Sequence, residues 1–184
     1  MKQRICRFIY HQVLGWTEKV SVPDFDKYII CAAPHTTNWD LFIGKLFIGA
    51  IGRKAGFLMK KEWFFFPLGV FFRWIGGIPV NRDKHSSMVE QIIYKIKNSQ
   101  TFHLAITPEG TRSPNPNWKK GFYYIALGAN IPIVLIGIDY KKKCIYAEKH
   151  IIPCGDINKD MKTIKLYFKQ FKGKYPEKFD IGNI

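Results

Sequence analysis

The sequence contains few cysteines and arranges none of them in pairs. The four are Cys6, Cys31, Cys144 and Cys154, and no two have the CxxC spacing of a metal or redox motif. This pattern argues against a disulfide framework or a cysteine zinc site, and it is typical of a protein in a reducing compartment. Cys31 lies within an apolar run, where we expect it to be a small core residue.

The sequence also lacks a long uninterrupted apolar run. Residues 121–138 carry no charge and are long enough to raise the question of a membrane-spanning helix. However, Gly128, Asn130, Pro132 and Gly137 interrupt them, so a helix that ends near Gly128 and a buried strand after it explain the pattern better. We therefore expect no transmembrane helix.

Negative charge is scarce. The chain has 14 Asp and Glu residues against 29 Lys and Arg, which gives a net charge of +15 at pH 7. This balance predicts an anionic partner, either nucleic acid or anionic lipid, unless it serves only as a soluble basic surface. The sequence has no zinc knuckle, RNA-binding signature or groove-reading helix, so we expect no nucleic-acid partner.

The length of 184 residues and the hydrophobic content of 47% fit one folded domain over residues 1–184. Residues 1–20 place Lys2, Arg4 and Arg7 among apolar residues and lack the cleavage site of a secretory signal. This segment is either a short amphipathic helix that lies on a membrane or a terminal helix packed on the domain.

Short apolar runs alternate with segments of helical periodicity. Residues 28–33 are typical of a buried strand, and the spacing of Met88, Ile92 and Ile96 predicts a helix over 86–98. Similar patterns predict strands over 56–59, 78–80, 102–106 and 131–138, helices over 41–50, 119–127 and 156–171, and edge segments 144–147 and 149–152 that pair. This alternation predicts an α/β fold with a mixed, mostly parallel sheet flanked by helices.

Aromatic residues make up 16% of the chain, and seven of them crowd one short segment. They are Trp63, Phe64, Phe65, Phe66, Phe71, Phe72 and Trp74. Pro67, Gly69 and Arg73 interrupt the segment, so it is too broken to span a bilayer. The rings could dip into a membrane interface or line an acyl channel. The alternative, which we expect for at least half of them, is a place in the core.

Residues 34–40 contain a histidine followed five residues later by an aspartate. A turn into a helix can bring His35 and Asp40 together, so that Asp40 holds one ring nitrogen and the other acts as a general base. A structural histidine that caps a strand is the common alternative at this spacing. The chain has no Gly-x-Ser-x-Gly nucleophile motif, which favours direct attack by a substrate hydroxyl.

The second polar run is Glu-Gly-Thr-Arg-Ser at residues 109–113. The planar fork of Arg112 suits a phosphate, and Gly110 allows the backbone to approach an anion. Glu109 either fixes Arg112 or receives a substrate hydroxyl, and an ordinary surface turn is the alternative. Because ligands collect beyond the carboxyl ends of strands, we expect this turn and His35 to meet in one crevice.

These runs resemble, in their order, the motifs of the 1-acyl-glycerol-3-phosphate acyltransferase family, over residues 30–140. The family's His-x4-Asp block is similar to residues 35–40, and its Glu-Gly-Thr-Arg-Ser block matches residues 109–113 letter for letter. Its Gly-x-Ile-x-Val-x-Arg block resembles residues 77–82, and its Ile-Pro-Ile-Val block matches residues 131–134.

The resemblance implies a glycerolipid acyltransferase-like fold, with His35 as the base and Asp40 as its partner. It implies that the phosphorylated acceptor is bound by Lys60, Arg82, Glu109, Gly110, Thr111 and Arg112. The implied reaction moves a fatty acyl group from acyl-CoA or acyl-carrier protein to the free hydroxyl of a lysolipid, first of all 1-acyl-glycerol-3-phosphate. It also implies that no cofactor or metal takes part and that the protein is peripheral on the inner face of the cytoplasmic membrane.

Three alternatives stay open. The acceptor could be a lyso-aminolipid or another lysophospholipid. Water could replace the acceptor, which would make the protein a thioesterase. Finally, the charge alone would also suit a non-catalytic basic protein that binds membrane or nucleic acid.

Overall fold

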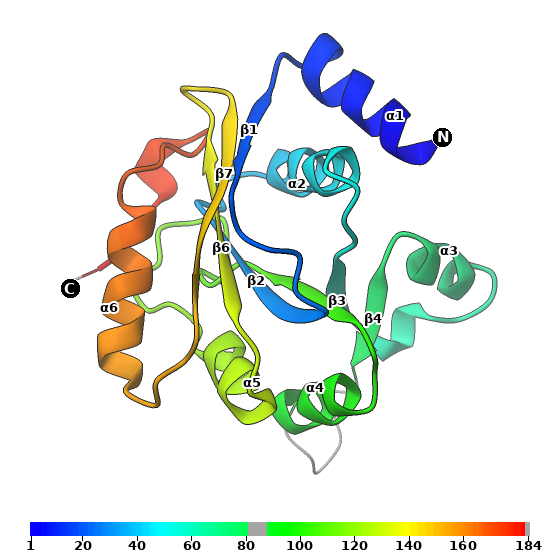
Figure 1. Ribbon diagram of the computed structural model, residues 1–184, viewed down its shortest axis with the longest axis vertical. Helices are drawn as coiled ribbons and strands as arrows, with labels where there is room; N and C mark the ends of the chain where they lie inside the picture. The colour runs from blue at the N-terminus through cyan, green and yellow to red at the C-terminus, as the bar shows by residue number, and fades with distance from the viewer. Residues whose placement is uncertain (81–87, 183–184) are drawn as a thin grey trace.

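The computed structural model describes residues 1–80 and 88–182 and contains a seven-stranded sheet in the order β1-β7-β6-β2-β5-β3-β4 (Figure 1). The strands are β1 (Thr17–Val20), β2 (Lys27–Ala33), β3 (Gly56–Lys60), β4 (Gly77–Val80), β5 (Phe102–Ile106), β6 (Ile133–Asp139) and β7 (Cys144–Ile151). Strands β6, β2, β5, β3 and β4 run parallel, whereas β7 is antiparallel to β6 and β1 is parallel to β7. The expected mixed, mostly parallel sheet is confirmed.

Helices cover both faces of the sheet. They are α1 (Lys2–Phe8), α2 (Trp39–Ala50), α3 (Leu68–Trp74), α4 (Met88–Lys97), α5 (Gly121–Ala129) and α6 (Ile157–Phe168), and a π-helical turn (Ile9–Val13) follows α1. Side chains alternate between the faces along each strand. In β2, Ile29 and Cys31 pack with α4, α5 and α6, whereas Tyr28 and Ile30 pack with α2 and the N-terminal segment. Cys31 is fully buried, as expected.

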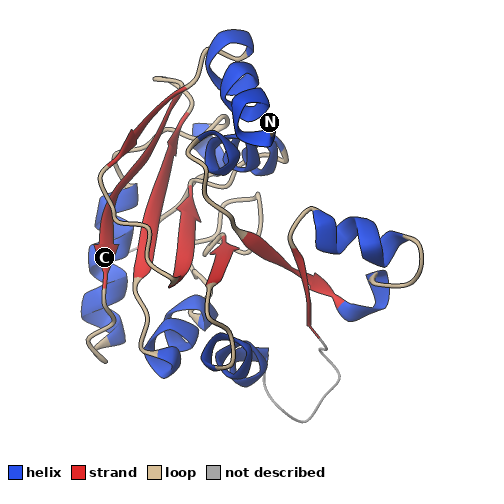
Figure 2. Ribbon diagram, turned by 45° about the vertical axis from the view of Figure 1, so that its right-hand side comes forward, coloured by secondary structure: helices blue, strands red, loops and turns tan. Residues whose placement is uncertain are grey.

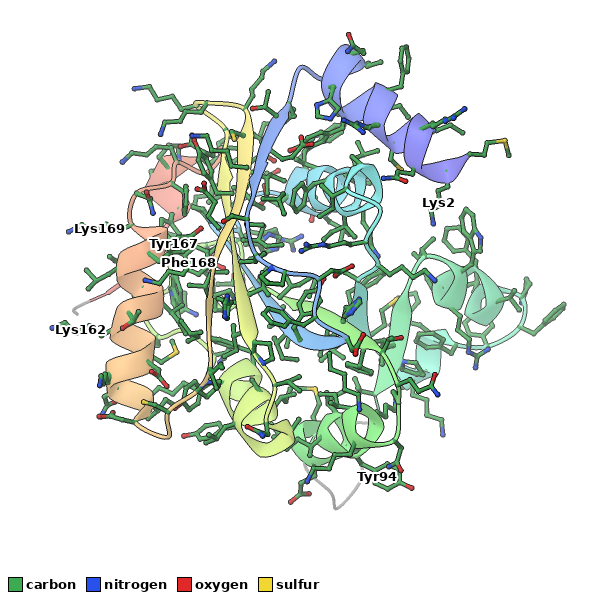
Figure 3. All side chains as sticks on the ribbon, in the orientation of Figure 1. Lys2, Tyr94, Lys162, Tyr167, Phe168 and Lys169 are labelled. Atoms are coloured by element: carbon green, nitrogen blue, oxygen red, sulfur yellow. The ribbon has the colours of Figure 1, made fainter. Side chains whose placement is uncertain are left out.

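Helix α6 shows how periodicity directs this packing. Ile164 and Phe168 are fully buried and lie one turn apart on one side of the helix. Figure 3 shows Lys162 and Lys169 pointing away from the sheet on the opposite side. The helix ends at Phe168, three residues before the expected end.

Two edge features differ from the sequence-based expectations. Residues 144–151 form one continuous strand that pairs with both β6 and β1, so the expected pairing between 144–147 and 149–152 is wrong. Strand β1 itself was not expected. It is short, and three of its four residues are exposed, so it lacks the apolar run by which a buried strand is recognised.

The charge-free stretch at 121–138 divides as expected. Helix α5 ends at Ala129, where Asn130 takes a left-handed conformation (φ 53°) that stops the helix, and β6 follows with every residue buried. Within residues 1–80 and 88–182, no helix is both long and apolar enough to cross a bilayer.

The expectation that at least half of the rings in the aromatic segment lie in the core is wrong. The rings of Trp63, Phe65, Phe66, Phe71 and Trp74 are exposed, and those of Phe64 and Phe72 are only partly buried. The segment forms a lobe, residues 61–76, that projects from the body between β3 and β4 (Figure 2).

Candidate active site

The two polar runs meet at the carboxyl ends of neighbouring strands. β2 and β5 pair in parallel register, so the loops that follow them leave the same edge of the sheet. The backbone N–H of His35 donates to Glu109 Oε1 at 2.7 Å, which joins one loop to the other. The expected meeting of His35 with the turn at 109–113 is therefore confirmed.

His35 and Asp40 form a close pair. His35 Nδ1 lies 3.0 Å from Asp40 Oδ2, and the same oxygen accepts from the backbone N–H groups of Thr36 (2.8 Å) and Thr37 (2.9 Å). Asp40 can reach back to them because it lies in the first turn of α2, directly after the loop. Through these hydrogen bonds the carboxylate holds residues 35–40 in a compact loop.

The other oxygen of Asp40 is also occupied. Tyr140, which directly follows β6, donates its hydroxyl to Asp40 Oδ1 at 2.7 Å. Burial, and then the neighbouring Asp40, raise the pKa of Tyr140 well above its ordinary value, so the hydroxyl keeps its proton and remains a donor. Sequence reasoning missed Tyr140. Its place just after the strand beside β2 was the one signal that could have pointed to it.

This arrangement leaves one nitrogen of His35 open. An ionised Asp40 only accepts, so Nδ1 carries the proton and Nε2 has a free lone pair. Among the described residues, none forms a hydrogen bond with Nε2. The side chain of His35 is 19% exposed, against 3% for Asp40. The pair therefore has the form of a general base with a buried orienting carboxylate.

Glu109 lies beneath the loop that carries His35. It is 3% exposed, and burial raises the pKa of its carboxyl from 4.5 to about 7. Its Oε1 accepts from His35, while Oε2 has no partner in the part of the chain that the structure describes. The expectation that Glu109 fixes Arg112 is wrong, because the carboxylate points to the histidine loop instead.

Arg112 bonds across to the histidine loop. Its Nη1 donates to Asn38 Oδ1, and the guanidinium is otherwise exposed. Gly110 takes φ +67°, a left-handed conformation that L side chains rarely adopt, and a Cβ there would lie 3.0 Å from Lys119 Cγ. The Thr111 hydroxyl accepts from the backbone N–H of Ser113 at 3.2 Å. The turn is thus tightly built, with the cationic fork of Arg112 at its surface.

Two predicted phosphate-binding residues are not placed by these contacts. Lys60 is the last residue of β3, and its side chain is not among those described. Arg82 lies outside the described residues altogether. The binding of the phosphorylated acceptor by both Arg82 and Arg112 stays a prediction.

No metal site emerges from residues 1–80 and 88–182, where no group of three or more His, Cys, Asp or Glu side chains could hold an ion. A cavity of about 430 Å³ lies elsewhere, lined by residues that include Trp118, Lys120, Met161 and Lys165. It contains none of the predicted site residues, so the candidate site rests on the geometry of the two loops.

Comparisons with known proteins identify the family and the fold. A family model described as Acyltransferase matches residues 16–139, more than half of the chain. The structure is similar to the crystal structure of the 1-acyl-sn-glycerophosphate (LPA) acyltransferase PlsC from Thermotoga maritima. The TM-score is 0.61 and the sequence identity 19%, over 91% of this chain and 77% of that one. At this identity the similarity shows a shared fold. The search of curated proteins found no match.

The bond from Tyr140 to Asp40 can be tested through stability. Tyr140→Phe leaves Asp40 Oδ1 buried without its donor. We expect the free energy of unfolding, measured with urea at neutral pH, to fall by about 1–3 kcal/mol, the usual cost of an unpaired buried polar atom. In the matched control Tyr124→Phe, whose side chain is 48% exposed, the change should be about 0.5 kcal/mol or less. Equal losses would contradict the assigned bond.

The burial of Glu109 predicts a pH dependence of stability. Because its pKa is raised from 4.5 to about 7, the folded state holds the proton more tightly than the unfolded state. The free energy of unfolding should therefore fall as pH rises from 4.5 through 7, by up to about 3 kcal/mol. Glu109→Gln should lack this loss, so its slope over that interval should be shallower. The exposed control Glu177→Gln should keep the wild-type slope, and a Glu109→Gln slope equal to wild type would refute the assignment.

Proposed function

The chain belongs to the acyltransferase family and is an acyltransferase, and on that premise we propose that it moves a fatty acyl group from a thioester to the free hydroxyl of a lysolipid. The observation that carries the proposal is the His35–Asp40 pair, with Nδ1 held by the carboxylate and Nε2 left open. The first candidate acceptor is 1-acyl-glycerol-3-phosphate. A lyso-aminolipid or another lysophospholipid presents the same hydroxyl and is the alternative.

In the proposed reaction, His35 Nε2 takes the proton from the acceptor hydroxyl as its oxygen attacks the thioester carbonyl. Asp40 stabilises the imidazolium that forms, since its carboxylate already lies against Nδ1. The tetrahedral oxyanion then collapses, the carbon–sulfur bond breaks, and the departing thiolate recovers the proton from His35. The products are the acylated lipid and a free thiol.

Arg112 is the proposed anchor for the acceptor phosphate. Its exposed guanidinium lies in the turn that is joined to the histidine loop through Asn38, so a headgroup bound there would lie close to His35. Gly110 and Thr111 belong to the same turn, and Lys60 and Arg82 remain candidates by resemblance. Glu109 is buried and holds the backbone of His35, so we assign it a positioning role in place of direct phosphate contact.

The donor in this proposal is acyl-CoA or acyl-carrier protein, both of which present a thioester. No cofactor or metal is assigned a step, because the base, its partner and the phosphate anchor are all side chains of this chain. The protein would act as a peripheral protein on the inner face of the cytoplasmic membrane. The basic charge of +15 supports attachment to an anionic surface.

Replacement of the base tests the function directly. His35→Ala should lower acceptor-dependent thiol release from acyl-CoA by about 10²–10⁴-fold, since that is the usual contribution of general base catalysis. Mass spectrometry of the lipid products, with one acyl donor and a panel of lysolipids, identifies the acceptor. His150→Ala is the control, since its exposed ring lies on β7. Full activity of His35→Ala would rule out the assigned base, and thiol release that needs no lysolipid would indicate a thioesterase.

The phosphate anchor is tested by a graded pair of variants. Arg112→Ala should raise the KM for a phosphorylated acceptor by about tenfold or more, since a charge-assisted bond is worth roughly 1.5–3 kcal/mol. Arg112→Lys keeps the charge without the fork and should fall between Ala and wild type. Lys159→Ala removes one exposed charge from α6 and should leave the KM unchanged. If only the KM for the acyl donor changed, the anchor would belong to the donor instead.

A further inference from the structure

The lobe at residues 61–76 exposes an unusual amount of apolar surface. Its most exposed large side chains are Phe66 (86%) and Trp74 (72%). The others that are exposed are Trp63, Phe65, Leu68, Val70 and Phe71. A cluster of this size is rare on a monomeric soluble protein, and it marks a surface that another apolar body covers.

The lobe is nevertheless well packed inside. Phe64 and Phe72 are partly buried, with ring centroids 6.0 Å apart, and the guanidinium of Arg73 lies over the Phe64 ring. Gly69 lies so close to Phe64 that a Cβ would come within 2.6 Å of its carbonyl oxygen. The exposed rings are therefore held outward by a packed interior.

The apolar surface continues onto α1 and α2. Lys2 Nζ lies 5.5 Å from the centre of the Trp74 ring, and Figure 3 shows this side chain pointing from α1 towards the lobe. Lys45 on α2 donates to the carbonyl of Ile75 at 2.7 Å, so this side of α2 faces the lobe. Exposed Leu41 and Phe42 lie one turn before Lys45. With exposed Ile5, which lies three residues after Lys2 on α1, these residues and the lobe make up what we call the apolar face.

Exposed basic side chains lie on the same segments as the apolar face. Lys2, Arg4 and Arg7 are exposed on α1, and Lys61 and Arg73 are exposed on the lobe. These segments carry a single acidic residue, Glu62. A second copy of this chain on the same face would bring like charges together, at a net charge of +15 on each partner. An anionic bilayer, by contrast, takes up aromatic rings at its interface and attracts lysine and arginine beside them.

We infer that the apolar face is the surface by which the protein sits on an anionic bilayer, with the lobe inserted between the headgroups. This inference rests on the proposed function in one respect only: the apolar face would serve to bring a lipid acceptor to the site. Trp39 and Phe42 extend the face along α2, with ring centroids 5.6 Å apart, and Trp39 directly precedes Asp40. An acceptor in the bilayer would thus reach His35 from the side of the membrane.

Vesicle flotation without any acyl donor tests the surface. The full chain should bind vesicles of phosphatidylcholine with phosphatidylglycerol more tightly than vesicles of phosphatidylcholine alone. The double variant Phe66→Ser, Trp74→Ser should lose about tenfold or more in affinity, because it removes two large rings from the interface. The matched control Ile152→Ser, Leu166→Ser changes two exposed apolar residues elsewhere and should bind like wild type. Equal losses in the two double variants would overturn the inference.

Tryptophan fluorescence gives an independent readout. Trp39, Trp63 and Trp74 are exposed, whereas Trp16 and Trp118 are 4% and 5% exposed. Lipids brominated on the acyl chain should quench the wild-type emission. The triple variant Trp39→Phe, Trp63→Phe, Trp74→Phe, which keeps only the two buried tryptophans, should lose most of that quenching. Quenching that persists in this variant would place the inserted surface elsewhere. Circular dichroism and thermal unfolding confirm that each variant folds.

Two further outcomes separate this inference from its rivals. If the chain is a dimer by light scattering, and the lobe variant Phe66→Ser, Trp74→Ser is a monomer, the face belongs to a second copy and the membrane inference fails. The variant His35→Ala should bind vesicles like wild type. If the wild-type chain binds vesicles through the lobe but transfers no acyl group, the proposed function is refuted while the membrane surface stands.

Discussion

The candidate site depends on one buried carboxylate. A buried carboxylate is costly unless its oxygens are paired, and Asp40 receives four donors: two backbone N–H groups, the His35 ring and the Tyr140 hydroxyl. Three of these donors come from residues 35–37, so the charge forces the loop to fold back onto the start of α2. The orientation of the histidine ring follows from this fold, since Asp40 Oδ2 is the acceptor that lies against Nδ1.

The fourth donor, the Tyr140 hydroxyl, links the loop at residues 35–40 to the rest of the chain. Tyr140 follows β6, the neighbour of β2, and its backbone N–H donates to the carbonyl of Lys172 at 2.8 Å. From there the C-terminal segment returns to the same loop, where the backbone N–H of Tyr175 donates to the Thr36 hydroxyl at 3.3 Å. Gly173 lies so close to Thr36 that a Cβ would meet its side chain at 2.8 Å. Residues beyond 139, where the match to the family model ends, therefore brace the loop that carries His35.

Periodicity in the sequence was enough to predict most of the sheet, because burial on both faces imposes apolar runs that are easy to recognise. The pairing of His35 with Asp40 was also predictable, since it needs only five residues and a helix start. Tyr140 was not, because it lies 100 residues from Asp40 and its role depends on which strands are neighbours. The aromatic lobe was misjudged for a different reason. Residues 61–76 project from the body as a lobe, so most of their rings do not reach the core, and the residue pattern alone does not reveal that projection (Figure 2).

The scarcity of acidic residues connects the site with the surface. Of the 14 Asp and Glu residues, Asp40, Glu109 and Asp139 are buried near the carboxyl ends of three neighbouring strands. A carboxylate on the surface would repel both a phosphorylated headgroup and an anionic bilayer, whereas one held inside can orient a histidine without meeting either. The raised pKa of Glu109, about 7, weakens its repulsion further, because near neutral pH part of the population carries no charge there. An excess of Lys and Arg over Asp and Glu, which gives the chain its charge of +15, suits a reaction on anionic lipid. Carboxylates that serve such a reaction are expected to be buried.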